Sequence, residues 1–174
     1  MNILIISLPR TGSSELGKKL SIKNKLDYKF EPFNPLNENY ENSDLKNSVV
    51  KTIIFHKPKY ISEHNRLNWL IDLTKNFEKI ILLSRKDLIA CAESWSYLNH
   101  KMKTSNFTSI LAYLWEKTPN YEIEYENIKK WDNELNYISK SINIPITYYE
   151  DIYDLNNIDR LRKGNKTDYK TKLI

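Results

Sequence analysis

Short apolar runs that alternate with longer stretches of helical periodicity are the feature that most constrains the fold of this chain. Each run has the length of a strand that is buried on both faces, and each stretch between them has apolar residues at helical spacing. This order favours an α/β fold in three layers, with helices flanking a mostly parallel central sheet. The predicted strands are residues 3–7, 49–55, 79–84 and 146–149. The predicted helices begin near residue 12 and cover 63–76, 87–101 and, as one or two helices, 107–141.

The remaining segments contain no internal repeat, low-complexity tract or domain linker, so we expect residues 1–174 to form a single domain. Residues 28–47 are polar and contain Pro32 and Pro35, which is typical of an active-site loop or lid. The tail that begins at Asp159 is basic and is expected to be loop-like.

Composition narrows the class of protein without naming a function. With 40% hydrophobic and 28% charged residues the chain has a globular composition, which excludes a disordered protein. The net charge of +5 suits a polyanionic small molecule as well as a nucleic acid. Cys91 is the single cysteine, and no run approaches the roughly 20 apolar residues of a membrane span. We therefore expect a cytoplasmic protein.

The stretch Pro9-Arg-Thr-Gly-Ser-Ser14 follows the first predicted strand and opens the first predicted helix. Strand, tight turn and helix are the layout of a P-loop-like phosphate site, because amide N–H groups at a helix N-terminus point at one spot and favour an anion there. The pattern GxxxxGK[ST] is absent, which disfavours a kinase-type P-loop. A plain turn with a capping serine is the alternative interpretation of this stretch taken alone.

Further stretches carry charges near predicted strand ends. Arg85 and Lys86 follow the third predicted strand, and Ser94 lies farther along the helix after it, so a basic group and a hydroxyl could hold a second phosphate. A basic cluster with one glycine lies at 162–170, and two acids follow the fourth predicted strand. Each of these features is ordinary by itself.

Together, these stretches resemble one family, the sulfotransferases that use 3′-phosphoadenosine 5′-phosphosulfate (PAPS). Residues 9–14 are similar to the 5′-phosphosulfate loop of the carbohydrate and tyrosyl-protein sulfotransferases, and residues 84–95 to the family's 3′-phosphate motif. Tyr148-Tyr-Glu-Asp-Ile152 is similar to Arg-Tyr-Glu-Asp-Leu, and residues 162–170 to the C-terminal Arg-Lys-Gly motif of cytosolic members. The order agrees along nearly the whole chain, so the chain is identified as a compact member.

The resemblance implies a site for PAPS and for its product, adenosine 3′,5′-bisphosphate, without a metal ion. Lys86 has the family's spacing to Ser94 and Arg85 lies one residue farther, so either could hold the 3′-phosphate. The resemblance also implies a carbohydrate or other small hydroxyl acceptor as the partner, with no nucleic acid and no membrane. The implied cofactor-binding residues are Arg10, Thr11, Gly12, Ser13, Ser14, Arg85, Lys86, Ser94, Arg162, Lys163 and Gly164.

Three residues are candidates for catalysis. Arg10 would stabilise charge that grows on the leaving phosphate. Glu31, in Phe30-Glu-Pro-Phe33, resembles the glutamate base of the carbohydrate and tyrosyl-protein sulfotransferases. His56 resembles the histidine base of the cytosolic members, and it could equally orient the acceptor.

Two other functions remain open at this point. A non-catalytic module could retain the nucleotide pocket without an acceptor site, and a nucleotide kinase-like enzyme is disfavoured by the missing Walker lysine. Trp95, Trp115 and Trp131 fall on helical faces and are expected in the core. Phe33 and Tyr40 could stack on an acceptor sugar or on adenine.

Overall fold

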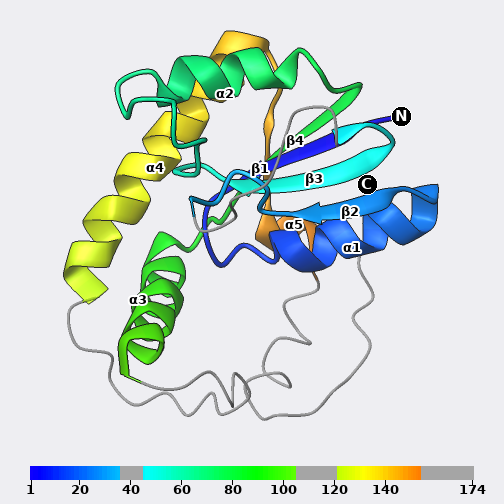
Figure 1. Cartoon of the computed structure of the whole chain (residues 1–174). Helices are drawn as coiled ribbons and strands as arrows, with labels where there is room; N and C mark the ends of the chain where they lie inside the picture. Colours follow the sequence, from blue (N-terminus) through cyan, green and yellow to red (C-terminus); the bar gives the residue numbers. More distant parts are fainter. Residues whose placement is uncertain (36–44, 105–120, 154–174) are drawn as a thin grey trace.

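The computed structural model describes residues 1–35, 45–104 and 121–153, and it contains a five-stranded sheet in which all the strands are parallel (Figure 1). The strand order is β2-β3-β1-β4-β5. The strands are β1 (Ile3–Ser7), β2 (Asp27–Phe30), β3 (Ser48–Ile53), β4 (Lys79–Ser84) and β5 (Ile146–Tyr148). The expectation of a mostly parallel α/β sheet is therefore confirmed.

Helices cover both faces of this sheet (Figure 1). In β1, the side chains of Ile3 and Ile5 belong to one buried cluster, and those of Leu4 and Ile6 belong to another, because successive strand residues point to opposite faces. The first cluster lies against α1 and α5, and the second against α2, α3 and α4. The helices are α1 (Ser13–Asn24), α2 (Arg66–Thr74), α3 (Leu88–Thr104), α4 (Tyr121–Ile142) and α5 (Tyr149–Ile152).

Strand β2 corrects the interpretation of residues 28–47 as a loop that starts at residue 28. This strand pairs with β3 at the edge of the sheet, and its four residues, DYKF, alternate between charged and aromatic side chains. All four side chains are exposed or half-buried, so the strand contains no apolar run, and four alternating residues are too short a signal to predict it. Gly17 of α1 lets the helix approach β2, since a Cβ there would collide with the ring of Tyr28.

Other boundaries differ by smaller amounts. The predicted strand 146–149 ends at Tyr148, and Tyr149 begins the short helix α5. Of the predicted helical region 107–141, residues 121–141 lie in α4 and residues 107–120 lie outside the described ranges. Within the described ranges, no helix is both long and apolar enough to cross a membrane.

The tryptophans follow expectation, and Phe33 does not. Trp95 and Trp131 are half-buried against the core, with ring centroids 6.5 Å apart. Phe33 is buried and packs edge-to-face on Trp69 at 4.9 Å, so the idea that its ring stacks on a ligand is wrong. Trp115 and Tyr40 lie outside the described residues.

Candidate functional site

Four predicted site residues follow the carboxyl ends of four neighbouring strands. Glu31 follows β2, His56 follows β3, Arg10 follows β1 and Arg85 follows β4. Because these strands are parallel and adjacent, their carboxyl ends meet at one edge of the sheet (Figure 1). This edge is where α/β sheets bind their ligands.

The loop between β1 and α1 closes through its own buried hydroxyl groups. Thr11 Oγ1 donates to the carbonyl oxygen of Leu8 at 2.9 Å, and Ser7 Oγ donates to Ser13 Oγ at 3.0 Å. The side chains of Thr11 and Ser13 are therefore turned into the protein, and Ser14 remains half-buried at the start of α1.

Gly12 is the residue that lets this loop turn into the helix. It precedes α1 with a left-handed backbone (φ 68°), which an L side chain rarely adopts. A Cβ at Gly12 would lie 3.0 Å from ring carbons of both Tyr149 and Tyr153. The Tyr153 hydroxyl also donates to the Gly12 carbonyl oxygen at 2.9 Å, so these two tyrosines hold the loop in place.

Helix α3 contacts the same loop through two residues one turn apart on one helical face. The thiol of Cys91 donates to the carbonyl oxygen of Pro9 at 3.0 Å, and Arg10 Nε donates to Ser94 Oγ at 2.9 Å. Burial raises the pKa of Cys91 to about 12, which keeps this thiol protonated as a donor. The structure thus joins Arg10 and Ser94, which are far apart in the sequence.

Arg85 and Lys86 point to different surroundings. The Arg85 side chain is only 15% exposed, with Nε 3.6 Å from Glu150 Oε1 and the guanidinium carbon 5.1 Å from the centre of the Tyr149 ring. No hydrogen-bond acceptor for Arg85 Nε occurs among the described residues. The Lys86 side chain is 55% exposed and its ammonium lies 2.5 Å from Asp151 Oδ1. Arg85 is therefore the one that faces inward.

Glu150 connects the β4–α3 turn to the end of β5. Its carboxylate accepts hydrogen bonds from the backbone N–H groups of Lys86, at 2.9 Å, and Asp87, at 3.3 Å. Asp87 in turn accepts the N–H of Ala90 at 2.9 Å at the start of α3. The acidic stretch after β5 is thus in contact with the predicted 3′-phosphate motif.

Glu31 forms a buried ion pair with Lys51 of β3. The two side chains are 11% and 4% exposed, and Lys51 Nζ donates to Glu31 Oε1. The backbone of Glu31 is left-handed (φ 47°), and its N–H donates to the Lys51 carbonyl oxygen at 2.8 Å. Asn34 Nδ2 lies 3.3 Å from Glu31 Oε2. The predicted base is therefore a buried, paired carboxylate and not an exposed loop acid.

His56 is buried beside this pair. Desolvation lowers the pKa of His56 to about 4, although the Glu31 carboxylate opposes that shift, and Lys51 favours it. His56 is consequently a neutral imidazole at pH 7. Its Nδ1 has no hydrogen-bond partner in the described part of the chain.

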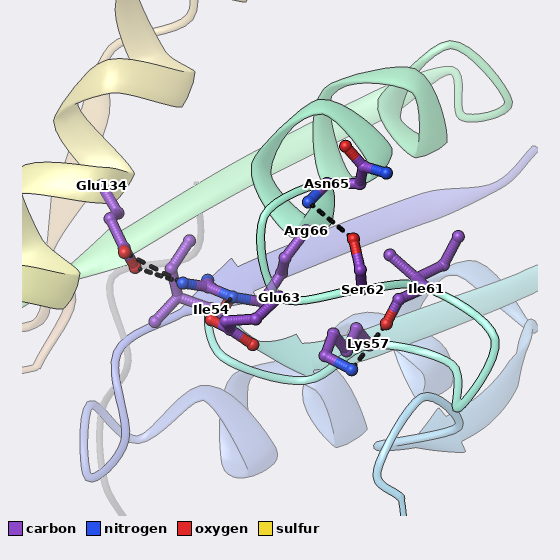
Figure 2. Close-up of polar contacts among 8 residues, drawn as sticks. All are labelled: Ile54, Lys57, Ile61, Ser62, Glu63, Asn65, Arg66 and Glu134. Carbon is purple, nitrogen blue, oxygen red and sulfur yellow. Dashed lines mark hydrogen bonds and ion pairs between the residues drawn. The ribbon is translucent and has the colours of Figure 1, made fainter.

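Arg66 anchors the segment that carries His56 (Figure 2). Its Nη1 donates to the carbonyl oxygen of Ile54 at 2.6 Å, and its Nη2 lies 2.9 Å from both carboxylate oxygens of Glu134 on α4. The side chain of Arg66 is 2% exposed. Within the same segment, Lys57 Nζ donates to the Ile61 carbonyl oxygen at 2.6 Å (Figure 2).

Three residues that take part in these contacts are not among the candidates named from the sequence: Lys51, Arg66 and Tyr153. Lys51 stands in an otherwise apolar strand run, and that position is the signal by which it could have been found. Arg66 and Tyr153 leave no such signal, because their roles depend on contacts with distant residues. The predicted cofactor residues Arg162, Lys163 and Gly164 lie outside the described ranges.

The described residues offer no group of three or more His, Cys, Asp and Glu side chains that could hold a metal ion. The charged side chains at this edge include two pairs, Lys51 with Glu31 and Arg85 with Glu150, and Arg10, which donates to Ser94.

No protein-family model matches the chain, and no curated protein matches it in sequence. Among solved structures, the chain is similar to the YorR protein from Bacillus subtilis in its crystal structure with phosphorylated GDP. The identity is 11%, the match covers 84% of each chain, and the TM-score is 0.41. A likeness this low carries no argument about the ligand or the activity of the chain described in this article.

Proposed function

We propose that this protein is a sulfotransferase with a P-loop-like fold, which moves the sulfuryl group of PAPS to a hydroxyl of a carbohydrate or another small acceptor. One observation carries the proposal. Sequence segments that resemble separate motifs of that family are in direct contact at one edge of the sheet: Arg10 with Ser94, Gly12 with the ring of Tyr149, and Arg85 with Glu150.

Two positively charged places on this edge suit the two phosphate groups of the donor. The first is Arg10 with the start of α1, where backbone amides and a permanent charge favour the 5′-phosphosulfate. The second is Arg85, which we assign to the 3′-phosphate in preference to Lys86. Arg85 is the inward-facing cation, and Arg10 and Arg85 both lower the pKa of Cys91 against the larger effect of its burial, so both charges act on one side chain.

The chemistry needs a base on the acceptor side of the sulfuryl group. The acceptor oxygen forms a bond to sulfur, and the bond between sulfur and the bridging oxygen breaks, leaving its electron pair on the 5′-phosphate. The acceptor proton goes to the carboxylate of Glu31. Arg10 stabilises the charge on the phosphate that leaves, as in phosphoryl transfer.

His56 has a different role in this proposal. A neutral imidazole with an unsatisfied Nδ1 among the described residues suits a hydrogen bond to the acceptor hydroxyl. At a pKa of about 4, His56 is a weaker base than an imidazole in water, so we assign proton acceptance to Glu31 and orientation of the acceptor to His56.

Transfer of labelled sulfate from PAPS across a panel of glycans and small hydroxyl compounds tests the proposal. Glu31→Gln should bind adenosine 3′,5′-bisphosphate like the wild type, and its rate should fall by about 10²–10⁴-fold, the usual size of a general-base contribution. The control is Glu78→Gln, which changes a 66% exposed glutamate at the amino end of β4.

Two results would overturn the proposal. If Glu31→Gln transfers sulfate at the wild-type rate, Glu31 is not the base. If the wild type binds the bisphosphate but transfers sulfate to no acceptor in the panel, the protein is a nucleotide-binding module and not an enzyme.

A further inference from the structure

In the described part of the chain, the anionic contact of the buried lysine at the carboxyl edge is with the proposed base. Lys51 lies near the end of β3, which is otherwise lined by buried apolar and small hydroxyl side chains. Its ammonium is buried with the carboxylate of Glu31 and stands 4.9 Å from the centre of the Phe30 ring. Both charged groups of the pair are therefore shielded from water.

Charges from each packed element act on this pair. Burial lowers the pKa of Lys51, the Glu31 carboxylate raises it, and Arg10 in the loop after β1 lowers it. The charge of Glu31 also acts to raise the pKa of His56, after β3, and of Tyr28, on β2. The Glu31 carboxylate thus stabilises the charged form of Lys51 in a place where burial opposes that charge.

The backbone supports the same pairing. The N–H of Glu31 donates to the Lys51 carbonyl oxygen at 2.8 Å, so main-chain and side-chain contacts join the same two residues. The left-handed conformation at Glu31 (φ 47°) is costly for a residue with a Cβ and persists only when its surroundings enforce it. Lys51 therefore contacts one oxygen of this carboxylate and Asn34 the other, and of these two contacts the one with Lys51 is charged.

We propose that Lys51 is a positioning residue for Glu31, which fixes the direction of the carboxylate so that it accepts the proton of the acceptor hydroxyl. This inference rests on the proposed sulfotransferase function. A buried ion pair adds little stability over an apolar pair of similar size, so a role in the site is a better reason for the pair than stability.

The test compares Lys51→Met, which keeps much of the side-chain length without the charge, with Lys51→Arg, which keeps the charge. The readouts are kcat and the KM for PAPS, measured separately for sulfate transfer. Without the cation, the Glu31 carboxylate loses the contact that orients it, so in Lys51→Met kcat should fall by about 10–100-fold while the KM for PAPS stays within about twofold. Lys51→Arg should recover most of the lost kcat.

A second readout separates this inference from the proposed function. Adenosine 3′,5′-bisphosphate should bind to wild type and Lys51→Met within about twofold, since Lys51 acts on the acceptor side. Thermal unfolding should show that Lys51→Met lowers Tm and that adding Glu31→Gln restores part of the loss, because the unpaired buried charge is then removed. This unfolding comparison does not depend on what the protein catalyses.

The outcomes are distinct. A kcat that is unchanged in Lys51→Met, or that falls equally in Lys51→Arg, overturns the positioning role. A double variant no more stable than Lys51→Met overturns the pairing itself. If the wild type neither binds the bisphosphate nor transfers sulfate, the proposed function fails, and the catalytic role of Lys51 fails with it even where the unfolding data support the pair.

Discussion

Arg10 and Glu31 have left-handed backbones, with φ of 61° and 47°, although neither is a glycine. Such a conformation costs about 1–2 kcal/mol for a residue with a Cβ. It directs both side chains from strand ends onto the carboxyl edge of the sheet, where Ser94 and Lys51 hold them. Backbone strain of this kind concentrates at functional sites, which agrees with the roles proposed for the two residues.

The burial of His56 predicts a pH dependence of stability. The unfolded chain takes up a proton on this imidazole below about pH 6.5, whereas the folded protein does so only near pH 4. The unfolded state therefore binds more protons in this window, and the free energy of unfolding falls as pH drops from 6.5 to 4, by up to about 3 kcal/mol from this group. Stability from the neutral imidazole is complete above pH 6.5.

Denaturant unfolding at several pH values between 7 and 4 measures this effect. Carboxylates also destabilise the fold at low pH, so the comparison is with His56→Gln, in which the other groups remain. We expect the wild type to lose more stability than His56→Gln over the window. Parallel curves for the two proteins would show that His56 takes up its proton equally in the folded and unfolded states.

At the scale of elements, Arg66 connects the segment after β3 to α4, and its ion pairs should dominate the stability of that segment. Its two carboxylate partners allow a comparison of a buried with an exposed ion pair, since the Glu134 side chain is 14% exposed and the Glu63 side chain is 64% exposed. Glu134→Gln leaves a buried guanidinium without its main counter-charge and should cost about 3 kcal/mol. Glu63→Gln should cost less than about 1 kcal/mol, because water screens an exposed pair.

Chemical denaturation of the two glutamine variants gives the comparison directly. Equal losses would mean that the burial of Glu134 adds nothing to its ion pair with Arg66, and would contradict this expectation.

How clearly a strand can be recognised in the sequence depends on how deeply its residues are buried. Strand β4, from Lys79 to Ser84, agrees with the predicted range 79–84 because burial on both faces requires an unbroken apolar run. Strand β2 lies at the sheet edge with Asp27 and Lys29 among its four residues, so burial imposes no pattern on it. Its existence depends on pairing with β3, which is a tertiary contact.

At the scale of the whole molecule, parallel topology explains which part of the site could be predicted. Once the strands are parallel, Arg10, His56 and Arg85 must lie on one edge, and the sequence suffices to say so. The contacts between site residues could not be predicted, because those of Arg10 with Ser94, Arg85 with Glu150 and Glu31 with Lys51 depend on the packing of α3, α5 and β3. The burial of Glu31 likewise depends on tertiary packing, so the sequence alone does not predict it.

The central claim is that this edge binds a nucleotide with phosphates at both its 3′ and 5′ positions, and calorimetric titration with adenosine 3′,5′-bisphosphate tests it most directly. We expect tight binding without magnesium, little response to ATP with magnesium, and affinity about 10–100-fold lower in Arg10→Ala, as loss of a charge-assisted contact predicts. Lys75→Ala, at a 73% exposed side chain, is the control and should bind like the wild type. Preference for magnesium-ATP, or unchanged affinity in Arg10→Ala, would contradict the account.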